Sequence, residues 1–390
     1  MNTTTSENKG ILTALGGACA FITFMGIGRF SFTALLPGMM DFHGFGDDVA
    51  GMMASWNFAG YLLGVMLMRR EKPGKRRFNL FTAFLLVSLI TTAGMGFVTE
   101  WYLLHAMRFL AGFASGVCFV LCSAIVLDTL AAVNRPVLSG VLYSGVGTGI
   151  AISGLTAMPL QALGGSPAGW VGMALLCIPL ACVAVFALRP GRNFAPPLSA
   201  ATGNTNAEQK KANPKYILLT AAYFLEGFAY IIGTTFIVAL VQEITASPEI
   251  AQASWLMTGV AAAISVPIWR LLVARTSYLQ MLILAFVLQA AGTFLPILSN
   301  TTVAALGGGL LLGGTFMGIT ALSLQYGIQL SGKPSANTVA IMTIFYGIGQ
   351  IIGPMVAGGM GLQIGFIISA VSMLAAAGLL LAASLIKQKG

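Results

Sequence analysis

The stretch that decides the fold runs from Trp101 to Leu130 and reads WYLLHAMRFLAGFASGVCFVLCSAIVLDTL. Arg108 is its only charged residue before Asp128, which lies close to its end. About 20 apolar residues are enough for a helix to cross the hydrocarbon core of a bilayer. We therefore expect a transmembrane helix here, with one buried charge. Apolar runs of similar length lie on both sides of it.

The composition of the whole chain agrees with a membrane protein. Of its 390 residues, 57% are hydrophobic and only 8% are charged, whereas a soluble domain carries about 25% charged residues. This excludes an ordinary soluble enzyme, a coiled coil and a disordered chain. The apolar runs are continuous rather than alternating, which argues against a transmembrane barrel. The net charge of +9 lies in short loops between these runs, so we expect the lipid bilayer and no nucleic acid as a partner.

The polar breaks between the apolar runs predict an all-α polytopic membrane protein with 12 transmembrane helices. A long polar stretch from Arg189 to Pro214 divides the chain. We predict an N-terminal six-helix bundle over 1–188, a cytoplasmic linker over 189–214 and a C-terminal six-helix bundle over 215–390. The predicted spans are 11–40, 49–68, 78–98, 101–130, 136–160, 168–188, 215–242, 250–273, 277–298, 302–330, 335–360 and 362–386.

The loop charges predict the orientation. If the N-terminus is cytoplasmic, all 20 Lys and Arg residues except Arg29 and Arg108 fall in the tails, the linker or the loops on the cytoplasmic side. The loops on the opposite side carry acidic residues such as Asp47 and Glu249. Basic loops stay on the cytoplasmic side of a membrane. We therefore expect a multi-pass protein of the bacterial inner membrane with both termini in the cytoplasm.

The two halves of the sequence also resemble each other. Ala54-Ser55-Trp56 recurs as Ala253-Ser254-Trp255, and glycines of the first half recur in the same order in the second half, at offsets of 199 to 202 residues. Each half holds an even number of predicted spans. The halves are therefore expected to be two parallel six-helix repeats, related by an axis along the membrane normal.

These features resemble the major facilitator superfamily over essentially the whole chain. The most specific match is Arg108 with Gly112 and Gly116, which fits the family pattern Arg-x-x-x-Gly-x-x-x-Gly in the fourth span. The run Gly26-Ile27-Gly28-Arg29-Phe30, followed by Pro37, resembles a poorly characterised bacterial branch. The resemblance implies secondary transport by alternating access, with spans one, four, seven and ten around a central cavity.

Two motifs of the superfamily depart from the usual pattern. Between spans two and three, Met68 stands where the family has an aspartate, and Glu71 is the nearest acid that could replace it. The antiporter motif of span five ends in Gly-Pro, but this chain has Ser153-Gly154 there. That second departure weakens an assignment as an antiporter.

Three charges lie inside predicted spans, where each is costly. Arg29 lies ~13 Å and Arg108 ~10 Å below the outer face at the rise of a helix. The resemblance implies that their two helices line the central cavity, so at this similar depth we expect the two arginines to share one substrate anion. We expect Glu226, in the middle of span seven, to carry the coupling proton or to pair with an arginine, so that Glu226 and Arg108 act together in proton coupling. The alternative is that each charge only bonds neighbouring backbone groups.

Neutral polar residues complete the predicted site. Tyr230 occupies the repeat position of Arg29, and Gln325 and Gln350 could bond a polar substrate, although buried glutamines often bridge helices. His105 shares a helix face with Arg108, and we expect it to be a neutral hydrogen-bonding group. Asp128 is expected to pair with Arg135 or with the basic loop between spans two and three.

We predict a secondary active transporter that moves a small organic solute, anionic or zwitterionic, by alternating access and coupled to protons. The alternative is a proton-driven drug or multidrug efflux carrier of the same superfamily. An intramembrane enzyme fits less well, because the chain has only two histidines and no motif for a nucleophile or a metal. A channel fits less well than a two-fold carrier. We expect a monomer with no cofactor, no metal site and no enzymatic activity.

Overall fold

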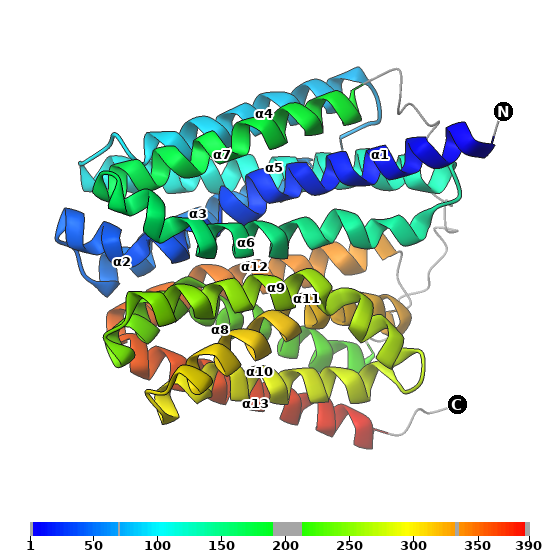
Figure 1. The fold of residues 1–390 in the computed structure, drawn as a ribbon. Coiled ribbons are helices and arrows are strands. Elements are labelled where there is room, and N and C mark those ends of the chain that lie inside the picture. The colour runs from blue at the N-terminus through cyan, green and yellow to red at the C-terminus, as the bar shows by residue number, and fades with distance from the viewer. Residues whose placement is uncertain (1–2, 69–70, 190–212, 332–334, 387–390) are drawn as a thin grey trace. The chain divides into compact units, whose positions relative to one another are not determined.

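The computed structural model describes residues 3–68, 71–189, 213–331 and 335–386, and all regular structure in these ranges is helical. Twelve helical segments are long and apolar enough to cross a membrane, which confirms the predicted fold class (Figure 1). The helices of the first half are α1 (Thr3–Phe21), η1 (Ile22–Ile27), α2 (Ser31–His43), α3 (Asp47–Met68), α4 (Lys75–Gly94), α5 (Trp101–Ala132), η2 (Pro136–Leu138), α6 (Ser139–Ala162) and α7 (Gly165–Leu188). Those of the second half are α8 (Pro214–Thr245), α9 (Pro248–Val273), α10 (Tyr278–Leu298), α11 (Thr302–Ser331), α12 (Ser335–Met360) and α13 (Leu362–Leu385).

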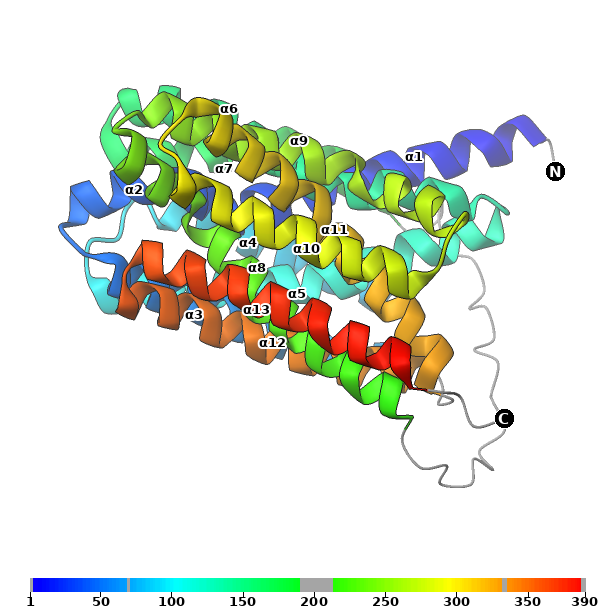
Figure 2. The ribbon, with the colours of Figure 1, turned by 90° about the horizontal axis from the view of Figure 1, so that it is seen from below.

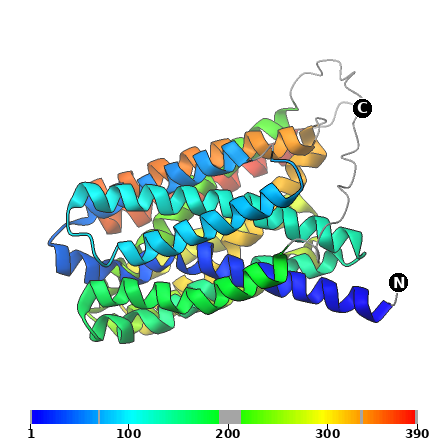
Figure 3. The ribbon, with the colours of Figure 1, turned by 90° about the horizontal axis from the view of Figure 1, so that it is seen from above.

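The chain forms two compact units. The first comprises Met1–Phe45 and Trp56–Ala200, and the second comprises Gly46–Ser55 and Ala201–Gly390. In the first unit the long helices α4 to α7 run roughly along one direction (Figure 3), and α8 to α13 of the second unit do the same (Figure 2). The predicted linker, 189–214, lies almost wholly outside the described residues, so its boundaries stay a prediction.

Glycines hold α3 and α5 together in the first unit. Gly112 of α5 faces the backbone carbonyl of Asn57, and Gly60 of α3 faces the carbonyl of Phe109. A side chain at either glycine would overlap the backbone of the opposite helix. Small residues allow this close approach of membrane helices. Part of the motif that suggested the superfamily is thus a packing surface in this structure.

The same contact recurs in the second unit. Gly313 of α11 faces the carbonyl of Thr258 of α9, and both residues lie 201 positions after Gly112 and Asn57. The contacts therefore repeat at an offset of 201 residues, which is also the offset between Gly26 and Gly227. The tryptophan match at an offset of 199 and the Gly112–Gly314 match at 202 lie slightly out of this register.

Candidate functional site

The first span contains an irregular, π-helical turn just before Arg29. Helix α1 passes into the π-helical turn η1, and residues 28–30 form a turn before α2 begins at Ser31. Gly26 of η1 lies against the backbone of Gly149 in α6, where a side chain would not fit. The predicted first span is a single helical segment, Asn8–His43, but its π-helical turn was not predicted, although the two glycines at 26 and 28 are a signal for an irregularity. Such π-helical turns are frequent at functional sites.

Arg29 is buried in the first unit with part of its guanidinium unbonded. The side chain is 4% exposed, and its Cζ atom lies 4.3 Å from the ring centre of Phe58 and 4.1 Å from that of Tyr61. Its Nη1 atom donates to the Met25 sulfur at 3.6 Å. The Nε and Nη2 atoms have no hydrogen-bond partner among the described residues. These two atoms form one edge of the guanidinium.

Arg108 lies beside Arg29. It is 2% exposed, its Cζ atom lies 4.3 Å from the ring centre of Phe32, and its Nη2 donates to the Arg29 carbonyl oxygen at a long 3.5 Å. The charge of Arg29 acts unfavourably on that of Arg108. Neither arginine forms an ion pair in the part of the chain that the structure describes. Two buried cations thus lie near each other, and neither has an acidic partner among the described residues.

Two buried side chains next to this pair, Asn57 and His105, each leave a hydrogen-bond acceptor unbonded. Asn57 is fully buried and donates its Nδ2 to the Arg108 carbonyl oxygen at 2.8 Å, while its Oδ1 has no partner among the described residues. His105, one helical turn from Arg108, bonds through Nδ1 to the Trp101 carbonyl oxygen at 2.7 Å. Since a carbonyl only accepts, Nδ1 carries the proton, and the buried Nε2 is an acceptor in the neutral ring. Asn57 was not among the predicted site residues.

The second unit buries an acid instead of a cation. Glu226 of α8 is 0% exposed, and the Gln289 Nε2 atom lies 3.2 Å from both of its carboxylate oxygens. The Gln289 Oε1 atom accepts from the Thr315 hydroxyl at 2.9 Å. No basic side chain pairs with Glu226 within the described ranges. The sequence analysis missed Gln289 and Thr315, because neutral polar residues in apolar helices carry no distinctive pattern.

Tyr230 and Gln350, two of the residues predicted to bind substrate, contact each other in the second unit. Gln350 donates to the Tyr230 hydroxyl, and the Tyr230 ring stacks on Phe316 and Tyr346 with centroids 5.5 Å apart. Tyr346 also lies in the electrostatic field of Glu226. Gln325 lies elsewhere in the second unit: it is exposed and accepts from the Tyr278 hydroxyl at 3.0 Å. Its assignment as a substrate ligand stays a prediction.

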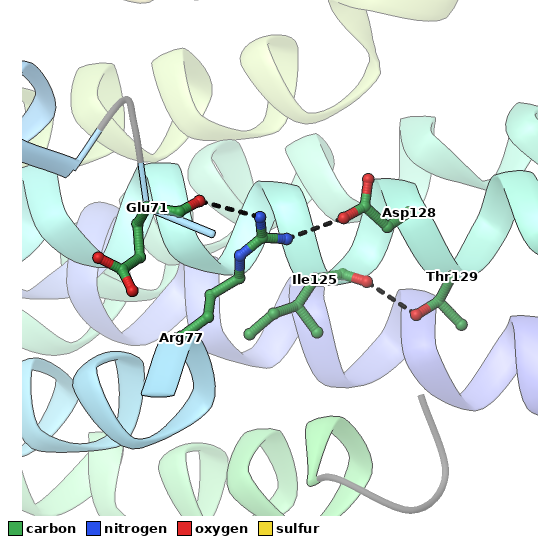
Figure 4. A network of polar contacts seen from close by, with 5 residues as sticks. All are labelled: Glu71, Arg77, Ile125, Asp128 and Thr129. Atoms are coloured by element: carbon green, nitrogen blue, oxygen red, sulfur yellow. Dashed lines mark hydrogen bonds and ion pairs between the residues drawn. The ribbon is translucent and has the colours of Figure 1, made fainter. Parts of the chain in front are cut away.

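A separate ion-pair network ties α4 to α5 (Figure 4). Arg77 donates from Nη1 to Asp128 at 2.8 Å and from Nη2 to the Glu71 carbonyl oxygen at 3.2 Å. The Glu71 carboxylate lies 3.6 Å from Arg76. Asp128 therefore pairs with the basic loop, one of the two partners that its position suggested. Glu71 contributes its backbone to this network and its carboxylate to Arg76.

The fold and these buried charges define the class. Twelve candidate spans in two helical units, each with ionisable groups buried in its interior, are the architecture of a solute carrier of the major facilitator superfamily. More narrowly, the chain belongs to the family described as "Uncharacterised MFS-type transporter YbfB", whose family model matches residues 21–387. It is a multi-pass membrane transporter and not an enzyme.

Solved structures of other carriers show the same fold. The nucleoside transporter NupG, in the structure of a point mutant, aligns with a TM-score of 0.73 at 12% identity, over 97% of this chain and 99% of that chain. A bacterial homologue of the human lysosomal transporter Spinster, in an inward-facing and unoccupied conformation, aligns with a TM-score of 0.68 at 15% identity, over 98% of this chain and 96% of that chain. A comparison with curated proteins finds no match. At these identities the likeness concerns the fold alone.

Proposed function

We propose that this transporter moves a small organic solute, anionic or zwitterionic, across the bacterial inner membrane by alternating access, coupled to protons. It acts as a monomer with both termini in the cytoplasm. The observation that carries the proposal is the pair of arginines in the first unit, each at least nine-tenths buried and neither paired with an acid among the described residues.

An anion accounts for this pair. A buried guanidinium is costly, by ~2.5–3.5 kcal/mol at the centre of a membrane helix, and two of them side by side add repulsion. A carboxylate would offset both terms. Arg29 has its Nε–Nη2 edge unbonded, and such an edge donates two parallel hydrogen bonds to a carboxylate. The same pair disfavours a lipophilic cation as substrate, and therefore the efflux alternative for cationic drugs.

Glu226 is the group that supports proton coupling. Its carboxyl is fully buried, and its hydrogen bonds within the described residues come from one neutral amide, that of Gln289. A buried carboxylate without a cationic partner is costly, and binding a proton removes that cost. Tyr346 of α12 lies in the electrostatic field of Glu226 and of two tyrosines from the same helix as Glu226, Tyr223 and Tyr230. Movement of the carboxyl between a buried and a hydrated environment would bind and release one proton.

The experiment that tests the anion proposal is a binding panel on the purified full-length protein. A ligand that binds the native state raises the midpoint of thermal unfolding. We expect organic carboxylates to raise it for the wild type, and sugars and lipophilic cations not to. Arg108→Lys should lose the effect, because an ammonium cannot reproduce a planar fork.

Arg76→Lys is the matched control. Its side chain is 80% exposed at the start of α4, so this variant should respond like the wild type. Stabilisation by lipophilic cations and not by anions would contradict the proposal and favour efflux. An anion response that Arg108→Lys leaves unchanged would remove Arg108 from the site.

A further inference from the structure

Both hydrogen-bond donors and hydrogen-bond acceptors are left unbonded on the buried side chains at the two arginines. Among the described residues, the unbonded donors include Arg29 Nε, Arg29 Nη2 and Arg108 Nε, and the unbonded acceptors include Asn57 Oδ1 and His105 Nε2. The buried hydroxyl of Ser31, two residues from Arg29, is unbonded as well and can donate or accept. All these side chains are more than nine-tenths buried. Most buried polar atoms in proteins are hydrogen-bonded, so a group of this kind points to a ligand that completes it.

Asn57 is held in the orientation that the inference requires. Its Nδ2 donates to the Arg108 carbonyl oxygen at 2.8 Å, and a carbonyl can only accept, so the amide oxygen is the atom left unbonded. The next residue, Phe58, lies against the Arg29 guanidinium. Asn57 therefore contacts the Arg108 backbone directly and adjoins a residue that contacts Arg29.

The unbonded acceptors need a donor, and the two arginines restrict what that donor can be. A simple carboxylate carries no donor, so it would satisfy the arginines and leave the Asn57 and His105 acceptors unbonded. An ammonium group would donate, but it would add a third positive charge beside two guanidiniums in a region of low dielectric constant. A hydroxyl group donates without adding charge.

We propose that the first unit binds a hydroxycarboxylate, with the carboxylate on Arg29 and Arg108 and a hydroxyl donating to Asn57 Oδ1. Asn57 is then a specificity-determining residue, and His105 Nε2 offers a second acceptor to substrates with more than one hydroxyl. This inference rests on the proposed function, because it names the class of anion that the arginine pair binds.

The test compares acids that share a carbon skeleton. Dissociation constants are measured on the full-length protein for lactate against propionate, malate against succinate, and gluconate against hexanoate. Alanine and aspartate serve as the amino counterparts. An unmet hydrogen bond of a buried group predicts that the hydroxy acid of at least one pair binds about 10-fold to 100-fold more tightly than its deoxy partner. The amino acids should bind more weakly than the hydroxy acids.

Variants separate this role from a role in folding. Asn57→Leu should reduce the hydroxy preference to about threefold or less while carboxylates still bind. His105→Phe, which keeps an aromatic ring beside Trp101, should reduce the preference for gluconate more than that for lactate. Gln161→Leu is the matched control, since Gln161 is an amide of the same unit that bonds the Leu35 carbonyl oxygen, and it should keep the wild-type preference. The ratio of two dissociation constants does not depend on protein yield, and the wild-type ratios stand if a variant fails to fold.

Each result has a distinct meaning. Equal binding of all three pairs, with binding that still requires Arg108, overturns the inference and leaves the anion proposal intact. Tighter binding of the amino acids also overturns it, in favour of a zwitterionic substrate. Absence of binding by every carboxylate overturns both proposals. A hydroxy preference that Asn57→Leu leaves unchanged removes Asn57 from its assigned role.

Discussion

Replacing Arg108 by methionine distinguishes a ligand-binding arginine from one that holds helices together. Burial of the charge costs ~2.5–3.5 kcal/mol. Against this, the contact with Phe32 at 4.3 Å contributes about 1–2 kcal/mol, and the 3.5 Å bond to the Arg29 carbonyl oxygen is too long to add much. Removing the Arg108 charge also removes its repulsion with Arg29, which further raises the free energy of unfolding. We therefore expect Arg108→Met to raise the free energy of unfolding of the ligand-free protein by about 1–2 kcal/mol.

Arg77 provides the control, because it is a buried arginine with partners. It bonds Asp128 at 2.8 Å and the Glu71 carbonyl oxygen at 3.2 Å (Figure 4). Arg77→Met leaves the Asp128 carboxylate without this partner. The Asp128 side chain is 37% exposed, so water takes over part of the lost interaction. We expect a loss of about 1–3 kcal/mol, opposite in sign to the effect at Arg108.

The assay is thermal unfolding of the two purified variants and the wild type in the same detergent, without ligand, followed by tryptophan fluorescence. The midpoint should rise for Arg108→Met and fall for Arg77→Met. Binding of carboxylates should be lost in Arg108→Met and kept in Arg77→Met. A fall in the midpoint of Arg108→Met as large as that of Arg77→Met would refute the reasoning and make Arg108 a structural residue.

Two further predictions concern coupling and orientation. Glu226→Gln keeps the size of the side chain but cannot release a proton, so in proteoliposomes it should permit solute exchange and block uphill movement driven by a pH gradient, whereas the exposed control Glu249→Gln should behave as wild type. Uphill transport by Glu226→Gln at the wild-type rate would exclude Glu226 from coupling. In intact cells, an impermeant thiol reagent should label a cysteine placed at Asp48 and spare one placed at Lys72, as the basic loops predict; labelling of the Lys72 position would reverse the orientation.

The spans could be predicted from the sequence because burial of apolar residues in lipid is a local property of each run. The π-helical turn in the first span could not be predicted from the sequence. This turn lies where Gly26 meets Gly149, a contact between segments far apart in the chain. The depth of Arg29 and Arg108 follows from the helical rise, and the resemblance to the superfamily placed their two helices at one cavity. Together these predicted that the two arginines lie near each other.

The neutral residues of the site could not be predicted from the sequence. Asn57, Gln289 and Thr315 are single polar residues in apolar helices, and such residues are common packing and bridging groups. What distinguishes Asn57 is a bond to the Arg108 backbone across 51 residues of sequence. What distinguishes Gln289 is its contact with Glu226 across 63 residues. Only the tertiary structure shows either contact.

The two units share a frame but differ in the groups that they bury. The contact of Gly112 with Asn57 recurs as that of Gly313 with Thr258, at an offset of 201 residues. At the same offset, the first unit has Met25, Arg29 and Arg108 where the second has Glu226, Tyr230 and Gly309. Each unit therefore places its charge where the other has a neutral residue. Under the proposed function, this asymmetry leaves the cations of the first unit to the solute anion and the acid of the second unit to the proton.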